Sequence, residues 1–130
     1  MNVPDNLMYT KDHEWLEIND NSVKVGIWDF AQSQLGDIIF IDLPNIGDQL
    51  VAGEPFGEIE AVKTVSELFS PITGVVLSIN ESVLDNPEQI NDFPYASGWL
   101  IVISKPESQK FVELLNSGSY KKIISWFNDI

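Results

Sequence analysis

The sequence predicts a single, mainly β domain, built as a sandwich or flattened barrel, with short helices and a C-terminal helical segment. Short runs rich in Val, Ile and Phe alternate with turns, and glycines divide them at an even spacing between Gly47 and Gly74. The chain has 130 residues, 44% of them hydrophobic and 21% charged, which is enough for one ordinary core. After Pro106 the apolar residues change from strand spacing to helical spacing.

The first forty residues predict an N-terminal hairpin followed by a short helix and a strand. Residues 7–10, 13–18 and 23–27 have strand character, and the polar cluster at 19–22 forms the turn between the last two. Asp29 is expected to cap a short helix over residues 30–35, which Gly36 ends in the left-handed region. Residues 38–41 form a compact apolar strand, closed by a turn at 43–45.

The middle of the chain predicts a β unit with a lysine at its centre. A strand over 56–61 enters a turn at Lys63, a strand over 65–69 leaves it, and a turn at 71–74 leads to a strand over 75–79. Lys63 therefore lies between strands. Neither Val62 nor Thr64 is a favoured residue for a tight primed turn, so the position of this turn is better defined than its type.

The last third predicts one strand and several helical turns. Asn86 followed by Pro87 is a capping residue before a proline at the first helical position, and residues 99–104 form a final strand. Two short amphipathic helices are expected on either side of Ser117-Gly118, from the apolar residues Phe111, Leu114, Leu115, Tyr120, Ile123, Ile124 and Phe127. The core is then expected over about 7–104 and the C-terminal helices over about 106–130, with their aromatic side chains used for packing.

Charge and composition exclude several functions. Twenty acids against seven lysines give a net charge of −13, which repels phosphate backbones and anionic membranes and favours partners with basic faces. The absence of cysteine means that redox chemistry has to come from an attached group, and one histidine, His13, cannot form a multi-histidine metal site. The first ten residues fit no targeting signal, and the apolar runs are too short to cross a bilayer. We expect a soluble, intracellular protein without a bound metal.

Lys63 is the main candidate for chemistry. It is the only basic residue between Lys24 and Lys105, an interval that holds twelve carboxylates. A solvated lysine in a turn is ordinary, but an amine on a flexible stem is also the group that a ligase can acylate. Neither a catalytic triad nor a phosphate-binding glycine loop can be identified, so an enzyme is the least favoured class.

The residues around Lys63 resemble the H proteins of the glycine cleavage system, which are lipoyl carriers. The resemblance includes residues 60–66 with Gly47, Gly57 and the segment 70–74. It extends to the motifs at 13–15, 25–27, 31–32, 35–37, 86–87, 94–95 and 98–99. These motifs stand in the order and spacing of that family, from about Leu7 to the C-terminal helices. A lysine-centred turn is shared with other lipoyl and biotinyl domains, whereas the N-terminal and Gly98-Trp99 motifs belong to H proteins.

The resemblance implies a hybrid barrel-sandwich fold that presents Lys63 on an exposed hairpin, with lipoic acid in amide linkage to its amine. By the same resemblance, the lipoyl-attaching enzyme recognises this hairpin through Gly47, Glu60, Glu67 and Gly74. Glu14 and Glu67, with Asp12, are implied as acids near the loaded arm. This chain departs from the usual pattern at Ala61, Thr64 and Trp28, and these departures bear on the efficiency of attachment more than on the function.

The function implied is that of a carrier and not of a catalyst. It shuttles the aminomethyl group of glycine from glycine decarboxylase (P protein) to the aminomethyltransferase (T protein), and dihydrolipoyl dehydrogenase (L protein) reoxidises the arm. A biotinyl domain is disfavoured because Val62 and Thr64, and not methionines, flank Lys63. A lipoyl-relay or non-carrier relative remains an alternative. The location is expected to be the cytoplasm for a bacterial chain and the mitochondrial matrix for a mature eukaryotic one.

Overall fold

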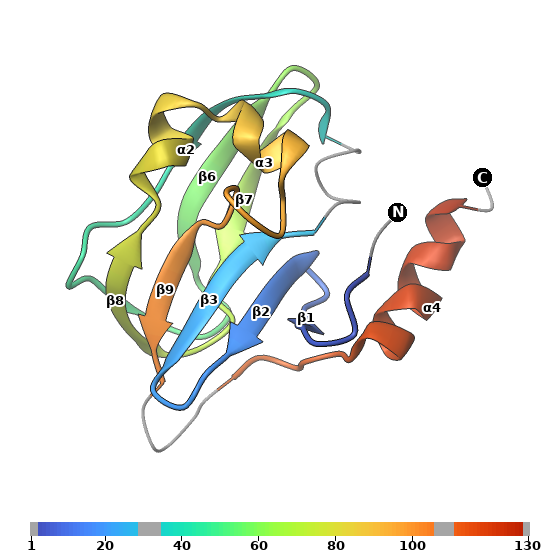
Figure 1. The fold of residues 1–130 in the computed structure, drawn as a ribbon, viewed down its shortest axis with the longest axis horizontal. Coiled ribbons are helices and arrows are strands. Elements are labelled where there is room, and N and C mark those ends of the chain that lie inside the picture. The colour runs from blue at the N-terminus through green and yellow to red at the C-terminus, as the bar shows by residue number, and fades with distance from the viewer. Residues whose placement is uncertain (1–2, 29–34, 106–110, 129–130) are drawn as a thin grey trace.

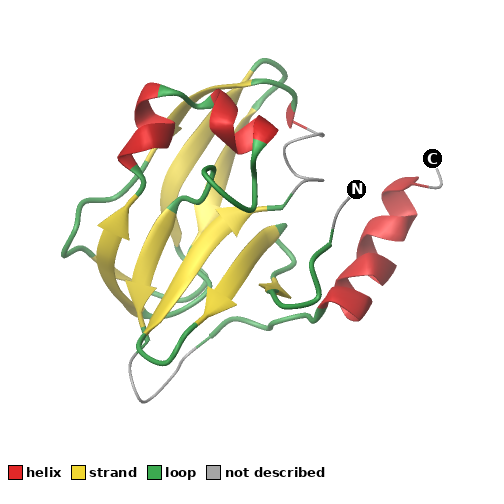
Figure 2. Cartoon of the chain, in the orientation of Figure 1, coloured by secondary structure: helices red, strands yellow, loops and turns green. Residues whose placement is uncertain are grey.

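The computed structural model describes residues 3–28, 35–105 and 111–128, and it contains two antiparallel β sheets (Figures 1 and 2). The larger sheet has the order β1 (Met8–Tyr9), β2 (Glu14–Ile18), β3 (Ser22–Ile27), β9 (Ile101–Ser104), β8 (Gly74–Ile79) and β5 (Gln49–Leu50). The smaller sheet has the order β4 (Ile38–Asp42), β6 (Pro55–Ala61) and β7 (Val65–Phe69). The helices are α2 (Glu81–Asp85), α3 (Glu88–Asp92) and α4 (Ser117–Asn128). The expected mainly β fold is confirmed.

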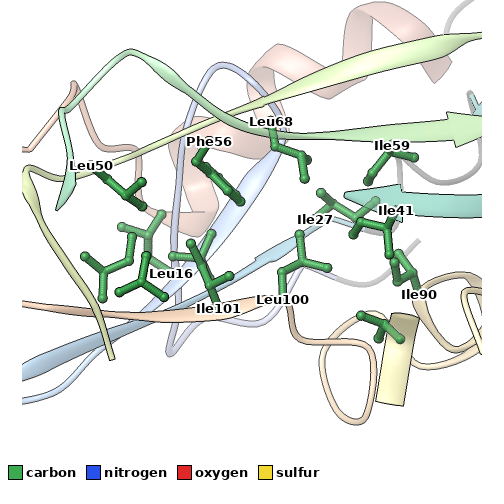
Figure 3. Close-up of a cluster of buried hydrophobic side chains, with 14 of the residues drawn as sticks. Leu16, Ile27, Ile41, Leu50, Phe56, Ile59, Leu68, Ile90, Leu100 and Ile101 are labelled. Atoms are coloured by element: carbon green, nitrogen blue, oxygen red, sulfur yellow. The ribbon is translucent and has the colours of Figure 1, made fainter. Parts of the chain in front are cut away.

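The core lies between the two sheets. Alternate residues of each strand face inward: Leu16 and Ile101 come from the larger sheet, and Ile59 and Leu68 from the smaller one, all almost fully buried. Figure 3 shows these side chains facing one another across the interior. Apolar and polar residues therefore alternate along the strands because one face of each sheet is buried.

The predicted N-terminal hairpin is confirmed, and a glycine sets its packing. Trp15 pairs with Gly26 across β2 and β3, and a Cβ at Gly26 would lie 2.4 Å from the Trp15 ring. The indole N–H of Trp15 donates to the carbonyl oxygen of Pro94 (2.9 Å), which ties the hairpin to the loop that follows α3. Of the helix expected at 30–35, residues 30–34 and the capping residue Asp29 lie outside the described residues, while Gly36 has the expected positive φ of 82°.

Two helical turns connect β8 to β9, and the sequence predicted only one of them. Asn80 caps α2 by accepting from the backbone N–H of Ser82 (3.2 Å), and its amide also donates to the carbonyls of Ser97 and Trp99 (both 2.7 Å). The prediction that Asn86 caps α3 is wrong. The N-cap of α3 is Pro87, without a side-chain hydrogen bond, because Asn86 ends α2 by donating its backbone N–H to Ser82.

The first of the two predicted C-terminal helices is also wrong. Residues 111–115 are extended, and Tyr9 and Leu115 exchange two backbone hydrogen bonds of 2.7 Å. Phe111 forms a second bridge with Ile72. The segment thus covers the edge of β1, and pairing with an open sheet edge outweighs its helical spacing.

The second predicted C-terminal helix is confirmed as α4, which packs through aromatic residues. Tyr120 is fully buried, stacks on Tyr9 with ring centroids 4.7 Å apart, and forms a T-shaped pair with Trp28 at a centroid distance of 5.0 Å. This packing confirms that Tyr120, the aromatic residue of α4 whose side chain is described, belongs to a core. No helix in the described ranges combines the length and apolar character needed to cross a membrane.

Candidate functional site

Lys63 lies at the apex of the hairpin between β6 and β7. Glu60 pairs with Val65, and the backbone N–H of Ala61 donates to the carbonyl oxygen of Thr64 (2.9 Å). Val62 and Lys63 are then the two central residues of the turn, and both are exposed. The prediction that Lys63 lies in a turn between two strands is confirmed.

The turn is not one of the types that close most two-residue hairpins. His13 is the only non-glycine residue with positive φ in the described ranges, so Val62 and Lys63 both have negative φ. This excludes types I′ and II′, whose twist matches that of paired strands, and also type II. The expectation that this turn is poorly suited to a primed type is therefore confirmed, and the turn has to be stabilised from outside.

That stabilisation comes from residues 36–38, which we call the support segment. The backbone N–H of Val62 donates to the carbonyl oxygen of Asp37 (3.0 Å). A Cβ built on Gly36 would lie 3.5 Å from Cε and 3.6 Å from Cδ and Cγ of Lys63, so the methylenes of the lysine lie over this glycine. Both the backbone of the turn and the stem of Lys63 rest on the same short segment.

The amine of Lys63 is not held by an ion pair with any other described residue. The salt bridge found in the described ranges joins Lys11 and Glu113, which are both exposed and 2.9 Å apart. Lys24 lies 5.5 Å from the ring centroid of Trp99 in a cation–π contact. Lys63 therefore offers an exposed primary amine at the apex of the β6–β7 hairpin.

Carboxylates and apolar side chains cover the outer face of the smaller sheet beside this turn. Glu60 lies on this face, directly between Phe40 and Val65 on the neighbouring strands. The next row across the sheet consists of three exposed acids, Asp42, Glu58 and Glu67. The structure therefore brings Glu60 and Glu67 to one exposed surface with the Lys63 turn.

Gly47 and Gly74 lie at the larger sheet and not beside Lys63. Gly47 has a φ of 95° and donates its backbone N–H to Val76 (2.8 Å). A Cβ at Gly74, the first residue of β8, would lie 2.4 Å from the carbonyl oxygen of Ser104. Gly74 also lines an open pocket of about 330 Å³ that contains no titratable side chain. Backbone geometry thus requires glycine at both positions, through a positive φ at Gly47 and a close backbone contact at Gly74.

Glu14 is a buried carboxyl at the junction of the two sheets. Its side chain accepts from the backbone N–H of Phe69 (3.1 Å), at the end of β7, and from the hydroxyl of Thr10 (3.4 Å). The residue is only 2% exposed, and no ion pair joins it to a cation of the described ranges. Burial, followed by the negative charge of Asp12, raises the pKa of Glu14 well above its ordinary value.

Asp12 lies in the turn between β1 and β2, two positions before Glu14. The backbone N–H of Asp12 donates to the hydroxyl of Thr10 (3.2 Å), which also binds Glu14. His13, with a φ of 65°, places its Nδ1 2.6 Å from the hydroxyl of Tyr120. Burial lowers the pKa of His13 against the opposing effect of Asp12. The structure thus joins Asp12 to Glu14, whereas Glu67 projects from the outer face of β7.

Sequence reasoning did not identify Asn91 of α3. Its side-chain oxygen accepts from the backbone N–H of Ile38 (2.9 Å), and its amide nitrogen donates to the carbonyl oxygen of Gly36 (3.0 Å). The two partners are the ends of the support segment. They precede Asn91 by more than fifty positions, and a single sequence carries no signal for such a contact.

Comparisons with known proteins agree with this geometry. Residues 7–126 match the family model described as Glycine cleavage H-protein. The chain is 47% identical over 124 residues to the glycine cleavage system H protein of Halalkalibacterium halodurans, with 95% of this chain and 97% of that protein covered. It is 48% identical over 125 residues to the corresponding protein of Anoxybacillus flavithermus, with 96% and 98% covered.

A solved structure supports the same assignment at the level of the fold. The crystal structure of a glycine cleavage system H protein from Mycobacterium marinum superimposes with a TM-score of 0.89 at 37% identity, covering 95% of this chain and 99% of that chain. This similarity agrees with the hybrid barrel-sandwich expected from the sequence. The chain belongs to the glycine cleavage H-protein family.

Proposed function

We propose that Lys63 is the lysine through which this chain carries its lipoyl group. Proteins of the family are non-catalytic carriers of the glycine cleavage system and hold lipoate covalently on a lysine. The observation that supports Lys63 is its exposed position at the apex of the β6–β7 hairpin, without an ion pair to another described residue. The attached group supplies the sulfur chemistry that a chain without cysteine lacks.

The carrier function requires the chain to visit several enzymes in turn. It takes the aminomethyl group of glycine from glycine decarboxylase and delivers it to the aminomethyltransferase, and dihydrolipoyl dehydrogenase completes the cycle. Tethering through Lys63 would raise the local concentration of the carried group at each active site. The net charge of −13 favours basic surfaces around those sites and makes association dependent on salt.

We propose two different roles for the four residues implied in lipoyl attachment. Glu60 and Glu67 are exposed on the outer face beside the turn, where a lipoyl-attaching enzyme could contact them directly. Gly47 and Gly74 would contribute indirectly, because a left-handed φ and a close backbone approach at the larger sheet require glycine there. In this proposal, recognition is a property of the hairpin surface, and the two glycines maintain the scaffold behind it.

We further propose that Glu14, assisted by Asp12 and Glu67, shelters the cationic amine of the carried aminomethyl group. Glu14 is a buried carboxyl without a cationic partner in the described ranges, so an incoming cation would lower its pKa and ionise it. Glu14 binds the backbone of Phe69. Phe69 follows Lys63 by six positions, which separates the two residues by roughly 20 Å along a strand. Only a long arm on Lys63 would reach that far.

The shelter can be tested by the stability of the loaded chain. In Glu14→Ala, the loaded form should release ammonia faster than the parent, because the amine loses the carboxylate that protects it from hydrolysis. Glu58→Ala, on the outer face, is the matched control and should leave the rate unchanged. A Glu14→Ala chain that hydrolyses at the parental rate would remove Glu14 from this role.

We propose that residues 1–130 form one domain and that the chain acts in the bacterial cytoplasm. The domain proposal is supported by the paired sheets, whose strands run from Met8 to Ser104, and by the packing of α4 on Tyr9. The location is supported by the bacterial sources of the most similar relatives described above.

The attachment proposal is tested by intact mass. The unmodified chain is incubated with a lipoyl-attaching enzyme and activated lipoate, beside Lys63→Arg and, as the matched control, Lys24→Arg. The parent and the control should each gain one lipoyl group, and Lys63→Arg should gain none. Full modification of Lys63→Arg would refute the assignment. Restoration of glycine cleavage by the modified chain and the three other components would then distinguish a carrier from a lipoyl relay.

A further inference from the structure

We infer that Asn91 is a positioning residue for the lipoyl lysine, because from α3 it fixes the support segment on which the Lys63 turn rests. The inference rests on the proposed function, since it takes Lys63 as the residue that is modified. Asn91 does not touch the reacting amine. It acts through Gly36 and Ile38, which it binds at both ends of the segment.

The Lys63 turn depends on the support segment for its position. Asp37 accepts the backbone N–H of Val62, Ile38 pairs with Ala61 in the ladder between β4 and β6, and Gly36 lies under the methylenes of Lys63. The turn has negative φ at both central residues, so its own geometry does not match the twist of the strands. A shift of residues 36–38 would therefore be transmitted to both the backbone and the stem of Lys63.

Asn91 clamps both ends of the support segment through its side-chain amide. Its side-chain oxygen accepts from the backbone N–H of Ile38 (2.9 Å), and its side-chain nitrogen donates to the carbonyl oxygen of Gly36 (3.0 Å). Its neighbour Ile90 is completely buried in the main core (Figure 3), so α3 provides a fixed anchor. Ile38 is 3% exposed, and its N–H would lose its partner without Asn91.

The Asn91 clamp should make the hairpin a better substrate for its modifying enzyme. An acceptor hairpin that is already ordered binds its modifying enzyme without the entropic cost of fixing the turn. Loss of the clamp should loosen the turn in the free chain and weaken binding to the lipoyl-attaching enzyme. The chemical step should change little, because the enzyme supplies the catalytic groups.

The experiment compares Asn91→Ala and Asn91→Asp with Ile103→Val, which trims a buried side chain of β9 and controls for a general loss of stability. Native-state amide exchange at Val62 is measured on the unmodified chains, and kcat and KM are measured for lipoyl attachment. In Asn91→Ala we expect exchange at Val62 to rise about tenfold relative to the β3 amides, the size of one lost hydrogen bond. KM should rise by a similar factor at nearly constant kcat.

The outcomes separate the clamp from the attachment site. Asn91→Asp keeps an acceptor for the N–H of Ile38 but loses the donor to Gly36. It should therefore raise both the exchange at Val62 and the KM of attachment, by a smaller factor than Asn91→Ala. If Asn91→Ala does not fold, Asn91→Asp alone tests the clamp. Variants of Asn91 that match Ile103→Val in both measurements would overturn the inference. If the parent chain gains no lipoyl group, the proposed function fails, whereas exchange at Val62 still tests the clamp.

Discussion

Substitution of Gly74 by Ala provides a direct test of whether this glycine is read by the lipoyl-attaching enzyme or serves the fold. The new Cβ would lie 2.4 Å from the carbonyl oxygen of Ser104, 2.9 Å from a methyl carbon of Ile103 and 3.0 Å from the hydroxyl of Ser104. The closest contact is about 1 Å shorter than ordinary van der Waals contact and involves backbone. Strands β8 and β9 therefore have to move apart.

The expected cost follows from that displacement. Overpacking of this kind costs about 1–3 kcal/mol, and the hydrogen bond from the N–H of Val75 to the Ser104 hydroxyl (2.8 Å) would be strained as well. For a chain of this size, 1 kcal/mol corresponds to roughly 3–5 °C in Tm. We expect Gly74→Ala to lower Tm by about 3–15 °C in thermal unfolding followed by circular dichroism.

Lipoyl attachment should then be measured well below the lowered Tm, where Gly74→Ala is folded. A scaffold role predicts a rate of attachment close to that of the parent under these conditions. Glu60→Ala, which changes only an exposed side chain beside the turn, is the complementary control and should lower the rate without lowering Tm. If Gly74→Ala kept the parental Tm but lost attachment, the reasoning from backbone contact would be refuted.

Three further predictions concern stability. Because burial raises the pKa of Glu14, the folded parent keeps a proton on this carboxyl at pH values where the unfolded chain has released it. The stability of the parent should therefore fall as pH rises above about 4.5, until the folded carboxyl ionises. Glu14→Gln lacks this proton uptake, so it should gain stability relative to the parent over that range. Parallel plots of Tm against pH for the two chains would contradict this. Asn80→Ala should lose about 2–4 kcal/mol in urea unfolding, since one buried side chain caps α2 and binds two carbonyls. Ser82→Ala, which retains that cap, is its control. Glu58→Lys should raise Tm slightly at low salt and not at high salt, because Glu58 directly faces Glu67; an increase independent of salt would count against a charge effect.

Local chemistry explains which elements could be predicted from the sequence. The β6–β7 hairpin and the exposed position of Lys63 follow from strand residues on both sides of a short segment centred on a lysine, and these signals lie within a few positions of one another. The extended course of residues 111–115 could not be predicted in this way, because its cause is the open edge beside Tyr9, about a hundred positions earlier.

The same limit applies to the site. Identification of the lysine needs only its charge and its surroundings in sequence, but the burial of Glu14 depends on Phe69 from the other sheet. The clamp of Asn91 on Gly36 and Ile38 depends on how α3 is seated. Side-chain contacts with distant backbone leave no periodic pattern, so they become visible only in three dimensions.

The bridge between Tyr9 and Leu115 has a consequence for the behaviour of the molecule in a crowded solution. The bridge covers β1, which is one edge strand of the larger sheet, and the other edge strand is β5, which has only two residues. Pairing of strands between two copies of the chain requires a long unpaired edge strand, which the larger sheet does not offer at either edge. The larger sheet of this carrier is thereby protected against edge-to-edge pairing with a second copy.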